Sequence, residues 1–477
     1  MKIAVLGDVG QGQYHVGDEA MAHAAARELE ARGLRDLVIL THNLEETEVE
    51  FGHPARKRPD VPWNAFERHR ALEELLDSSK QQASGEAQAV RRSILRALEG
   101  CDALLVTGGG NLTSQYGGLL FERMAFLHIA AELGVRMVVS GQTVGPVLTA
   151  PDAADLVPAL SLARLVGARE RSSQKLLDDL GVSSTRVLDD ASFLASRSSD
   201  AGYVAVTLAP GSGAMDRQDY IQTMARLVTE AARVSGRPVL FLPHVWTRGR
   251  EDGDTQIHQA VAERLDGVEA KLAPQMNALE TAQATANASL VLSTRYHPVV
   301  FASSAGVPVL PVAVDLYGEL RIGGTLENWG IRSTLRSLRQ LGGSADGAWV
   351  EAVWNSREGL LEHLSGCRPG MAEAHGLWWD SIASALEGRT SSPPPTLPEP
   401  AIWQGETSGV FANSKSWAER LNASNEMAIG NLLQHVDWLQ GELRAQQKPA
   451  ARRASSGQDR VHRAARRIAS RLRTRGS

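Results

Sequence analysis

Short apolar runs alternate with longer amphipathic stretches along most of this chain, and each run ends in glycine or polar residues. An apolar run bounded by turn residues is typical of a buried strand, and the stretches between the runs have helical spacing. Strands that alternate with helices favour a parallel sheet with helices on both faces. We expect strands at residues 2–6, 36–40, 103–107, 136–140, 165–168, 185–188, 203–208, 239–242, 290–292 and 309–314.

The pattern restarts after the loop at 195–201, which divides the strands into two groups of similar size. The sequence therefore predicts an α/β fold with two doubly wound, Rossmann-like domains at residues 1–198 and 199–388. Two such domains would bring the loops at their strand ends to a shared cleft.

Two segments do not fit simple strand–helix units. Residues 54–97 combine mixed charges with helical stretches at 68–76 and 87–98, and we expect an insertion between sheet units there. A helix at 376–386 is expected to close the second domain.

The last part of the chain has a different composition. Residues 389–402 are rich in serine and proline and read as a linker, and residues 403–449 are expected to be helical. Residues 450–477 are Arg-rich, with a thin apolar stripe at helical spacing. This basic tail would dock on anionic lipid or on a partner, or it would be a disordered, solvated tail.

Charge and composition add limits. The chain has 477 residues and a formal net charge of −5, which does not favour a nucleic-acid partner. Two cysteines, Cys101 and Cys367, are too few for a disulfide framework or a four-ligand zinc site. No stretch approaches the length of a membrane span, and the first apolar run is too short for a signal peptide. We expect a cytoplasmic protein, seated at the inner membrane face if the tail binds lipid.

A cation and an imidazole stand together where the strand at 290–292 ends. Arg295 and His297 follow this run, and a small-residue helix pattern follows them. Ligands of open α/β sheets bind just beyond the carboxyl ends of the strands. An arginine can grip phosphate or carboxylate in two-point contacts, and a histidine can move a proton near neutral pH. The pair indicates a site for an anionic substrate; a helix cap or pairing with nearby acids is the alternative.

Three glycines and an asparagine follow the strand at 103–107. Gly108, Gly109, Gly110 and Asn111 would let a ligand or another backbone approach closely, and their N–H groups can cradle an anion. Glycines that serve only the turn are the alternative. The turn after the first strand lacks the features of a P-loop or a dinucleotide fingerprint, so we expect neither ATP nor NAD. No cluster of His, Asp and Glu has metal spacing, so no metal is implied.

Further polar residues stand at predicted strand ends. Arg169 is a candidate second cation for the cleft, with pairing to Glu170 as the alternative. His244 is an equally good candidate for the site or for a structural role. Asp190 would orient a sugar hydroxyl or cap the next helix, and Asp18 is expected to be a helix N-cap.

The order of these motifs resembles that of the polysaccharide pyruvyl transferase family, over about residues 1–390. Each motif is short, and their joint order carries the resemblance. The matching segments are residues 17–20 (GDEA), 108–110 (GGG), 141–146 (GQTVGP), 169–173 (RERSS), 189–191 (DDA), 243–244 (PH), 295–297 (RYH) and 306–309 (GVPV).

The resemblance implies a GT-B-like fold and a phosphoenolpyruvate donor, with no other cofactor. Members attach the enolpyruvate carbon to two hydroxyls of one sugar, which gives a pyruvate ketal and releases phosphate. Arg295 is then the first choice for gripping the donor, and Arg169 the second. His297 is the expected general acid for the methylene carbon and later takes a proton from an attacking hydroxyl. Asp18, His244 and residues 108–111 are the other expected substrate contacts.

The chain departs from the family pattern in three places. Glu170 stands where the family has aspartate, and Thr143 where it has glycine. After the strand at 309–314, Tyr317 and Arg321 are present but the family's lysine is not. Two other functions stay open: a glycosyltransferase that uses a nucleotide-sugar, and a non-catalytic member that binds glycans or acts as a scaffold. The resemblance also implies a donor site in the second domain, at residues 199–388, and a saccharide acceptor, for which lipid linkage would be consistent with a membrane-bound tail.

Overall fold

Two parallel sheets organise the chain in the computed structural model. The structure describes residues 1–63, 67–77, 85–343, 345–389, 394, 396–407 and 409–411. The first sheet, with its helices, is called the first lobe here. Its strand order is β4 (Ala55–Lys57), β3 (Leu37–Thr41), β1 (Ile3–Val9), β5 (Ala103–Val106), β7 (Arg136–Val144), β8 (Leu165–Ala168) and β9 (Thr185–Arg186), and β6 (Gly109–Leu112) pairs with the far end of β7.

Alternation along β1 gives the first lobe two separate cores. Ile3 and Val5 are fully buried on one face, and Ala4 and Leu6 on the other. The first face packs against α1 (Val16–Ala31). The second face is covered by α3 (Arg68–Leu76), α4 (Glu86–Ala97), α5 (Gly117–Glu132), α6 (Ala150–Ser161) and α7 (Arg171–Asp179), while α2 (Leu44–Phe51) lies beside β3 and β4.

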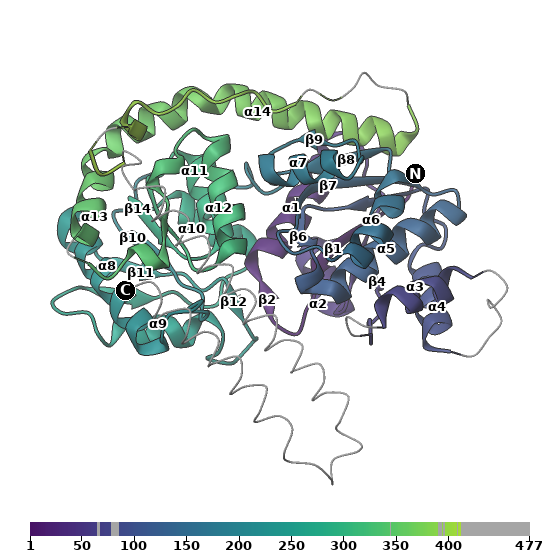
Figure 1. Ribbon diagram of the computed structural model, residues 1–477, viewed down its shortest axis with the longest axis horizontal. Helices are drawn as coiled ribbons and strands as arrows, with labels where there is room; N and C mark the ends of the chain where they lie inside the picture. The colour runs from purple at the N-terminus through teal and green to yellow at the C-terminus, as the bar shows by residue number, and fades with distance from the viewer. Residues whose placement is uncertain are drawn as a thin grey trace, which may run out of the picture. The chain divides into compact units, whose positions relative to one another are not determined.

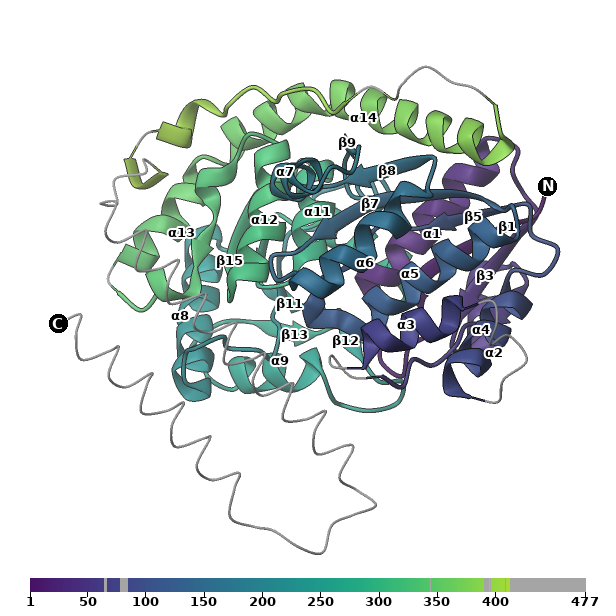
Figure 2. The same ribbon diagram turned by 45° about the vertical axis from the view of Figure 1, so that its right-hand side comes forward.

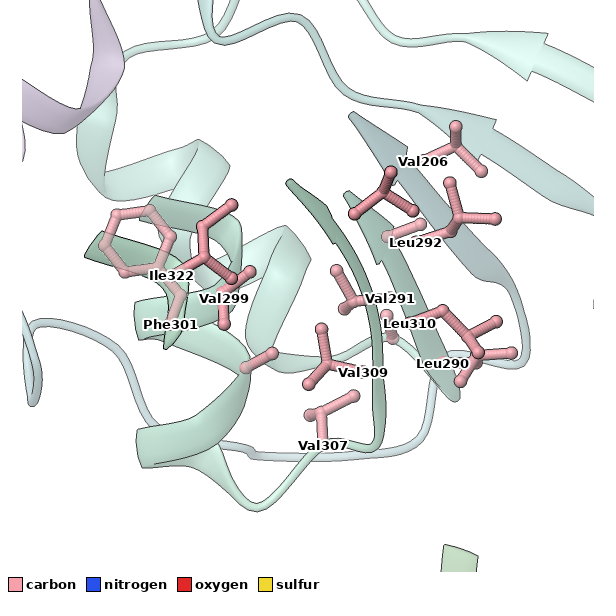
Figure 3. Close-up of a cluster of buried hydrophobic side chains, with 14 of the residues drawn as sticks. Val206, Leu290, Val291, Leu292, Val299, Phe301, Val307, Val309, Leu310 and Ile322 are labelled. Carbon is pink, nitrogen blue, oxygen red and sulfur yellow. The ribbon is translucent and has the colours of Figure 1, made fainter. Parts of the chain in front are cut away.

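The second sheet, with its helices, is the second lobe. Its strand order is β13 (Ala270–Leu272), β11 (Val239–Phe241), β10 (Val204–Thr207), β14 (Leu290–Ser293), β15 (Val309–Ala313) and β16 (Arg336–Ser337). Figure 3 shows aliphatic side chains of β10, β14 and β15 gathered beside Phe301 and Ile322. The surrounding helices are α8 (Arg217–Ser235), α9 (Asp254–Ala262), α10 (Ala278–Ala286), α11 (Tyr296–Ala305), α12 (Leu316–Asn328) and α13 (Ala345–Asn355).

The predicted α/β class with two doubly wound parallel sheets is confirmed. The helix expected at 376–386 has a different role. It is the end of a long helix, α14 (Arg357–Glu387), whose first half contributes Leu360 and Leu364 to the second lobe. Its last turns lie along the first lobe (Figures 1 and 2), where Trp378 and Trp379 are buried in the core on one face of the sheet. The helix therefore spans both lobes, because its buried side chains change partners halfway along.

Two other expectations differ from the structure. Residues 54–97 are no insertion, because β4 extends the sheet edge and Leu72, Leu75 and Ile94 are buried in the core of the first lobe. Part of the predicted linker is docked: the Leu397 N–H donates to the Arg186 carbonyl, the Arg186 guanidinium donates to the Leu397 carbonyl, and Leu397 is 3% exposed. Most of the predicted helical segment at 403–449 and the whole basic tail at 450–477 lie outside the described residues.

A two-stranded ribbon joins the lobes. β2 (Tyr14–His15) pairs antiparallel with β12 (Val245–Trp246), and the Val16 N–H donates to the His244 carbonyl at 2.9 Å. The ribbon continues directly into α1. This junction brings the N-terminus of α1 to the carboxyl end of the second sheet.

Candidate active site

Arg295 stands at the end of β14, as the residue before α11. Its guanidinium is paired with Asp254, and its Nε lies 3.2 Å from Asp254 Oδ2. Asp254 is fully buried and also accepts the backbone N–H groups of His244 and Val245, each at 3.0 Å. The side chain of Arg295 keeps 28% of its surface exposed. The alternative of pairing with an acid is therefore observed, yet one face of the cation stays open.

The ring of His297 packs on the backbone of α1 at Gly17. A Cβ at Gly17 would lie 1.8 Å from His297 Nδ1, so only glycine leaves room for the imidazole. The other ring nitrogen, Nε2, is buried and has no hydrogen-bond partner in the structure as described. Burial lowers the pKa of His297 to about 4, although Asp189 opposes this shift. The imidazole is therefore neutral at pH 7.

Asp189 links His297 to Arg169. Its Oδ2 accepts from Arg169 Nη1 at 2.6 Å and lies 3.8 Å from His297 Nε2. Burial alone would raise the pKa of Asp189, but Arg169 and His297 hold it below its ordinary value. A carboxylate that stays ionised beside a neutral imidazole can stabilise the imidazolium as it forms.

Arg169 is 1% exposed and is surrounded by partners of its own. Besides Asp189, its Nε donates to Thr143 Oγ1 at 2.8 Å and lies 3.2 Å from Glu170 Oε1. Its guanidinium carbon lies 4.4 Å from the centre of the Tyr296 ring. Arg169 therefore forms ion pairs with two carboxylates, and it is too buried to contact a substrate directly. Pairing with Glu170, the alternative to a substrate-binding role for Arg169, is present.

Side chains of the protein contact the glycine segment at residues 108–110. The Gly108 N–H donates to Asp190 Oδ2 at 2.6 Å, and burial raises the pKa of that carboxyl to about 7. The Gly110 carbonyl accepts from the Tyr317 hydroxyl, which comes from the second lobe. A Cβ at Gly110 would lie 2.0 Å from that hydroxyl oxygen. The two glycines thus let a carboxylate and a tyrosine of the other lobe approach the backbone.

Arg321 lies in the segment where the sequence departs from the family pattern, and no role was predicted for it. Its guanidinium carbon lies 3.7 Å from the centre of the Tyr317 ring and 5.3 Å from that of Tyr296. No carboxylate of the described residues lies within ion-pair distance of it. Tyr296 also touches His297, with ring centres 5.0 Å apart. Arg321 and His297 therefore flank one tyrosine.

The profile of the polysaccharide pyruvyl transferase family matches residues 15–315 of this chain, which include all of these groups except Arg321 and Tyr317. The chain belongs to the polysaccharide pyruvyl transferase family. A search of curated proteins finds no match.

Two solved structures share the fold of this pyruvyl transferase family member, which agrees with the predicted GT-B-like arrangement of two Rossmann-like lobes. A putative UDP-N-acetylglucosamine 2-epimerase from Listeria monocytogenes aligns with 83% of this chain and 98% of its own, at 12% identity and a TM-score of 0.51. The S. aureus MnaA–UDP structure covers 83% and 99%, at 11% identity and a TM-score of 0.51. Glycyrrhiza uralensis UGT73P12 covers 81% and 96%, at 11% identity and a TM-score of 0.47.

The structure brings several of the predicted site residues of this transferase together. Arg295 and His244 share Asp254, and His297 rests on the first turn of α1, which carries Asp18. Asp18 is not the N-cap, because α1 begins at Val16, and its carboxylate lies 3.3 Å from His15 Nδ1.

His244 is 3% exposed, and burial lowers its pKa well below the ordinary value. Its Nε2 has no hydrogen-bond partner within the described part of the chain. A second neutral imidazole therefore stands near His297. Gly109, Gly110 and Asn111 belong to the short strand β6, so of the four residues at the predicted turn only Gly108 lies outside a strand.

Four residues that shape the site were not expected in these roles: Gly17, Asp189, Asp254 and Arg321. Only Gly17 and Asp189 lie in motifs that the sequence offered. Asp254 lies 41 positions before its partner Arg295, with no local pattern that joins them. In the part of the chain that is described, no helix is long and apolar enough to cross a membrane, and no group of three or more His, Cys, Asp or Glu is placed to hold a metal ion.

Proposed function

We propose that this protein transfers the enolpyruvate group of phosphoenolpyruvate to two hydroxyls of one sugar of a polysaccharide or its precursor. The observation that carries the proposal is the neutral His297, whose unpartnered Nε2 stands beside the ionised pair of Asp189 and Arg169. Such an imidazole can take a proton from a hydroxyl, and the carboxylate favours the charged form that results.

The donor carries a phosphate and a carboxylate, so two cations should meet it. Arg295 and Arg321 are the cations that suit this role. The first is held by Asp254 with an open face, and the second is paired with no described carboxylate and stacks on Tyr317. Arginine matches both anions in two-point contacts. We now assign Arg169, which was the second choice, to the positioning of Asp189.

The proton movements balance with one imidazole. His297 takes the proton of the first sugar hydroxyl and passes it to C3, where the C2–C3 double-bond electrons form the new C–H bond and C3 becomes a methyl group. C2 becomes electron-deficient as that bond forms, and the sugar oxygen bonds to it. In the second step phosphate leaves C2, the other hydroxyl oxygen bonds there, and the imidazole takes that hydroxyl proton and gives it to the released phosphate. The products are a pyruvate ketal and inorganic phosphate.

Ligand stabilisation tests the donor class. Phosphoenolpyruvate at 100 times its Kd should stabilise the protein by about 2.7 kcal/mol, measured as a rise in Tm. Arg321→Leu should lose most of this rise, and Arg248→Leu, on the exposed rim of another cavity, should keep it. Stabilisation by UDP- or GDP-sugars in place of phosphoenolpyruvate would contradict the proposal and favour a glycosyltransferase.

A further inference from the structure

A cavity of about 550 Å³ lies next to the candidate active site, and its lining includes neither Arg295 nor His297. The first lobe supplies the turn at Gly10 and the helix α2, and the second lobe supplies Trp246 and Arg248. Its volume falls in the range of ligand pockets, and it opens between two lobes, where such pockets are common.

The cavity is linked to the active site through two short stretches of chain. Glu19 lines it and lies two residues after Gly17, on which the His297 ring rests. Trp246 lines it and lies two residues after His244. A ligand that reaches from His297 past the first turn of α1 would therefore enter this cavity.

The inner wall is aromatic. Tyr14 and Trp246 are partners across the β2–β12 ribbon, and their rings are stacked with centres 4.5 Å apart. Trp246 is 5% exposed, and its indole Nε1 has no hydrogen-bond partner among the described residues. A buried indole N–H usually finds an acceptor, and a ligand oxygen in the cavity would supply one.

Glutamates are among the polar residues that line the cavity. Glu19 is 3% exposed; one oxygen accepts the Gly10 N–H at 3.0 Å, and the other has no partner in the described structure. Glu50 accepts from the Tyr14 hydroxyl at 2.5 Å. The cations Lys57 and Arg248 are exposed and stand at the rim. Burial raises the pKa of Glu19 well above its ordinary value. With both cations at the rim, the described floor offers hydrogen bonds but no positive charge to a phosphate, so it does not suit a nucleotide.

We infer that this cavity is a subsite for the saccharide acceptor and binds an uncharged, hydroxyl-rich sugar unit next to the one that receives pyruvate. The inference rests on the proposed function. Sugar hydroxyls can donate to Glu19 and accept from the Trp246 indole, and the sugar's apolar face can lie on the aromatic wall. The site would select acceptors by the unit beyond the reacting one.

Saturation-transfer NMR with neutral disaccharides tests this inference. The probes are maltose, cellobiose, lactose and chitobiose, each with the full-length protein. At least one should bind, and phosphoenolpyruvate should not displace it. Trp246→Phe keeps the ring stack and removes the N–H, and Glu19→Gln keeps the shape of the side chain. Each should weaken binding about tenfold, while Trp354→Phe, outside the lining, should not.

The two proposals fail separately in this experiment. No binding of any probe, or equal binding to wild type and to the Trp246 and Glu19 variants, would overturn the acceptor subsite. Binding that is lost in these variants supports the subsite even if phosphoenolpyruvate gives no stabilisation, and only the donor proposal would then fall. A phosphorylated sugar that binds here better than every neutral probe would also overturn the inference.

Discussion

Gly17→Ala should move His297 while leaving helix α1 intact. The added Cβ would lie 1.8 Å from Nδ1, 2.2 Å from Cε1 and 2.4 Å from Cγ of the imidazole. Ordinary contact begins at 3.4 Å, so the ring must retreat by at least about 1.6 Å. A misplacement of about 1 Å can cost about 100-fold in rate, so we expect kcat to fall at least about 100-fold.

Helix propensity does not oppose this substitution, because alanine is favoured over glycine by up to about 1 kcal/mol inside a helix. The assay is phosphate release in the presence of phosphoenolpyruvate and acceptor, with circular dichroism to check the fold. Gly366→Ala in α14 is the matched control, because its Cβ would meet nothing within 4 Å, and kcat should not change. Wild-type kcat in a folded Gly17→Ala protein would refute the role of His297.

Three further changes probe the charges of the site. Arg321→Leu should raise the KM for phosphoenolpyruvate about 10- to 100-fold, because a charge-assisted hydrogen bond is lost, and Arg321→Lys should restore part of it; an unchanged KM would exclude this cation. Asp189→Asn should lower kcat at least about 100-fold and the free energy of unfolding by about 3 kcal/mol, because the His297 imidazolium and Arg169 both lose their carboxylate partner. A kcat equal to that of the wild type in steady-state kinetics would contradict the role of Asp189. Burial lowers the pKa of His258 to about 4, whereas in the unfolded chain this histidine binds a proton near pH 6.5. The stability of the folded protein should therefore fall by about 1.4 kcal/mol per pH unit as the pH drops from 6.5 to 4. His258→Gln should reduce that slope in urea unfolding, and an unchanged slope would contradict the assignment.

Local patterns predicted most of the sheets. Buried strands such as Ala103–Val106 and Leu290–Ser293 are short apolar runs bounded by turn residues, which distinguishes them from the longer helices. The ribbon of β2 and β12 could not be read in the same way, because each strand has two residues and pairs only with the other lobe. The exchange of partners along α14 was missed for the same reason: its apolar residues show burial but not against which sheet.

The positions of the candidate site residues were predicted in part. The strand-end rule placed Arg295 and His297 at a carboxyl edge, and the structure has them there. The rule predicts where a side chain lies but not which carboxylate it pairs with. Arg169 also follows a strand, yet it is buried between its neighbour Glu170 and Asp189 of another turn. Arg321 is paired with no described carboxylate and lies one helical turn after Tyr317. Which arginine is open to substrate depends on where the carboxylates lie, and that is a property of the assembled lobes.

Product formation in D₂O tests the central claim most directly. The protein would be incubated with phosphoenolpyruvate and a saccharide acceptor, and the ketal methyl group would be analysed by mass spectrometry and NMR. Proton delivery through His297 to C3 predicts one deuterium in that methyl group for each phosphate released. A ketal without deuterium would contradict the proton route, and sugar transfer from a nucleotide donor with no ketal would contradict the proposed reaction itself.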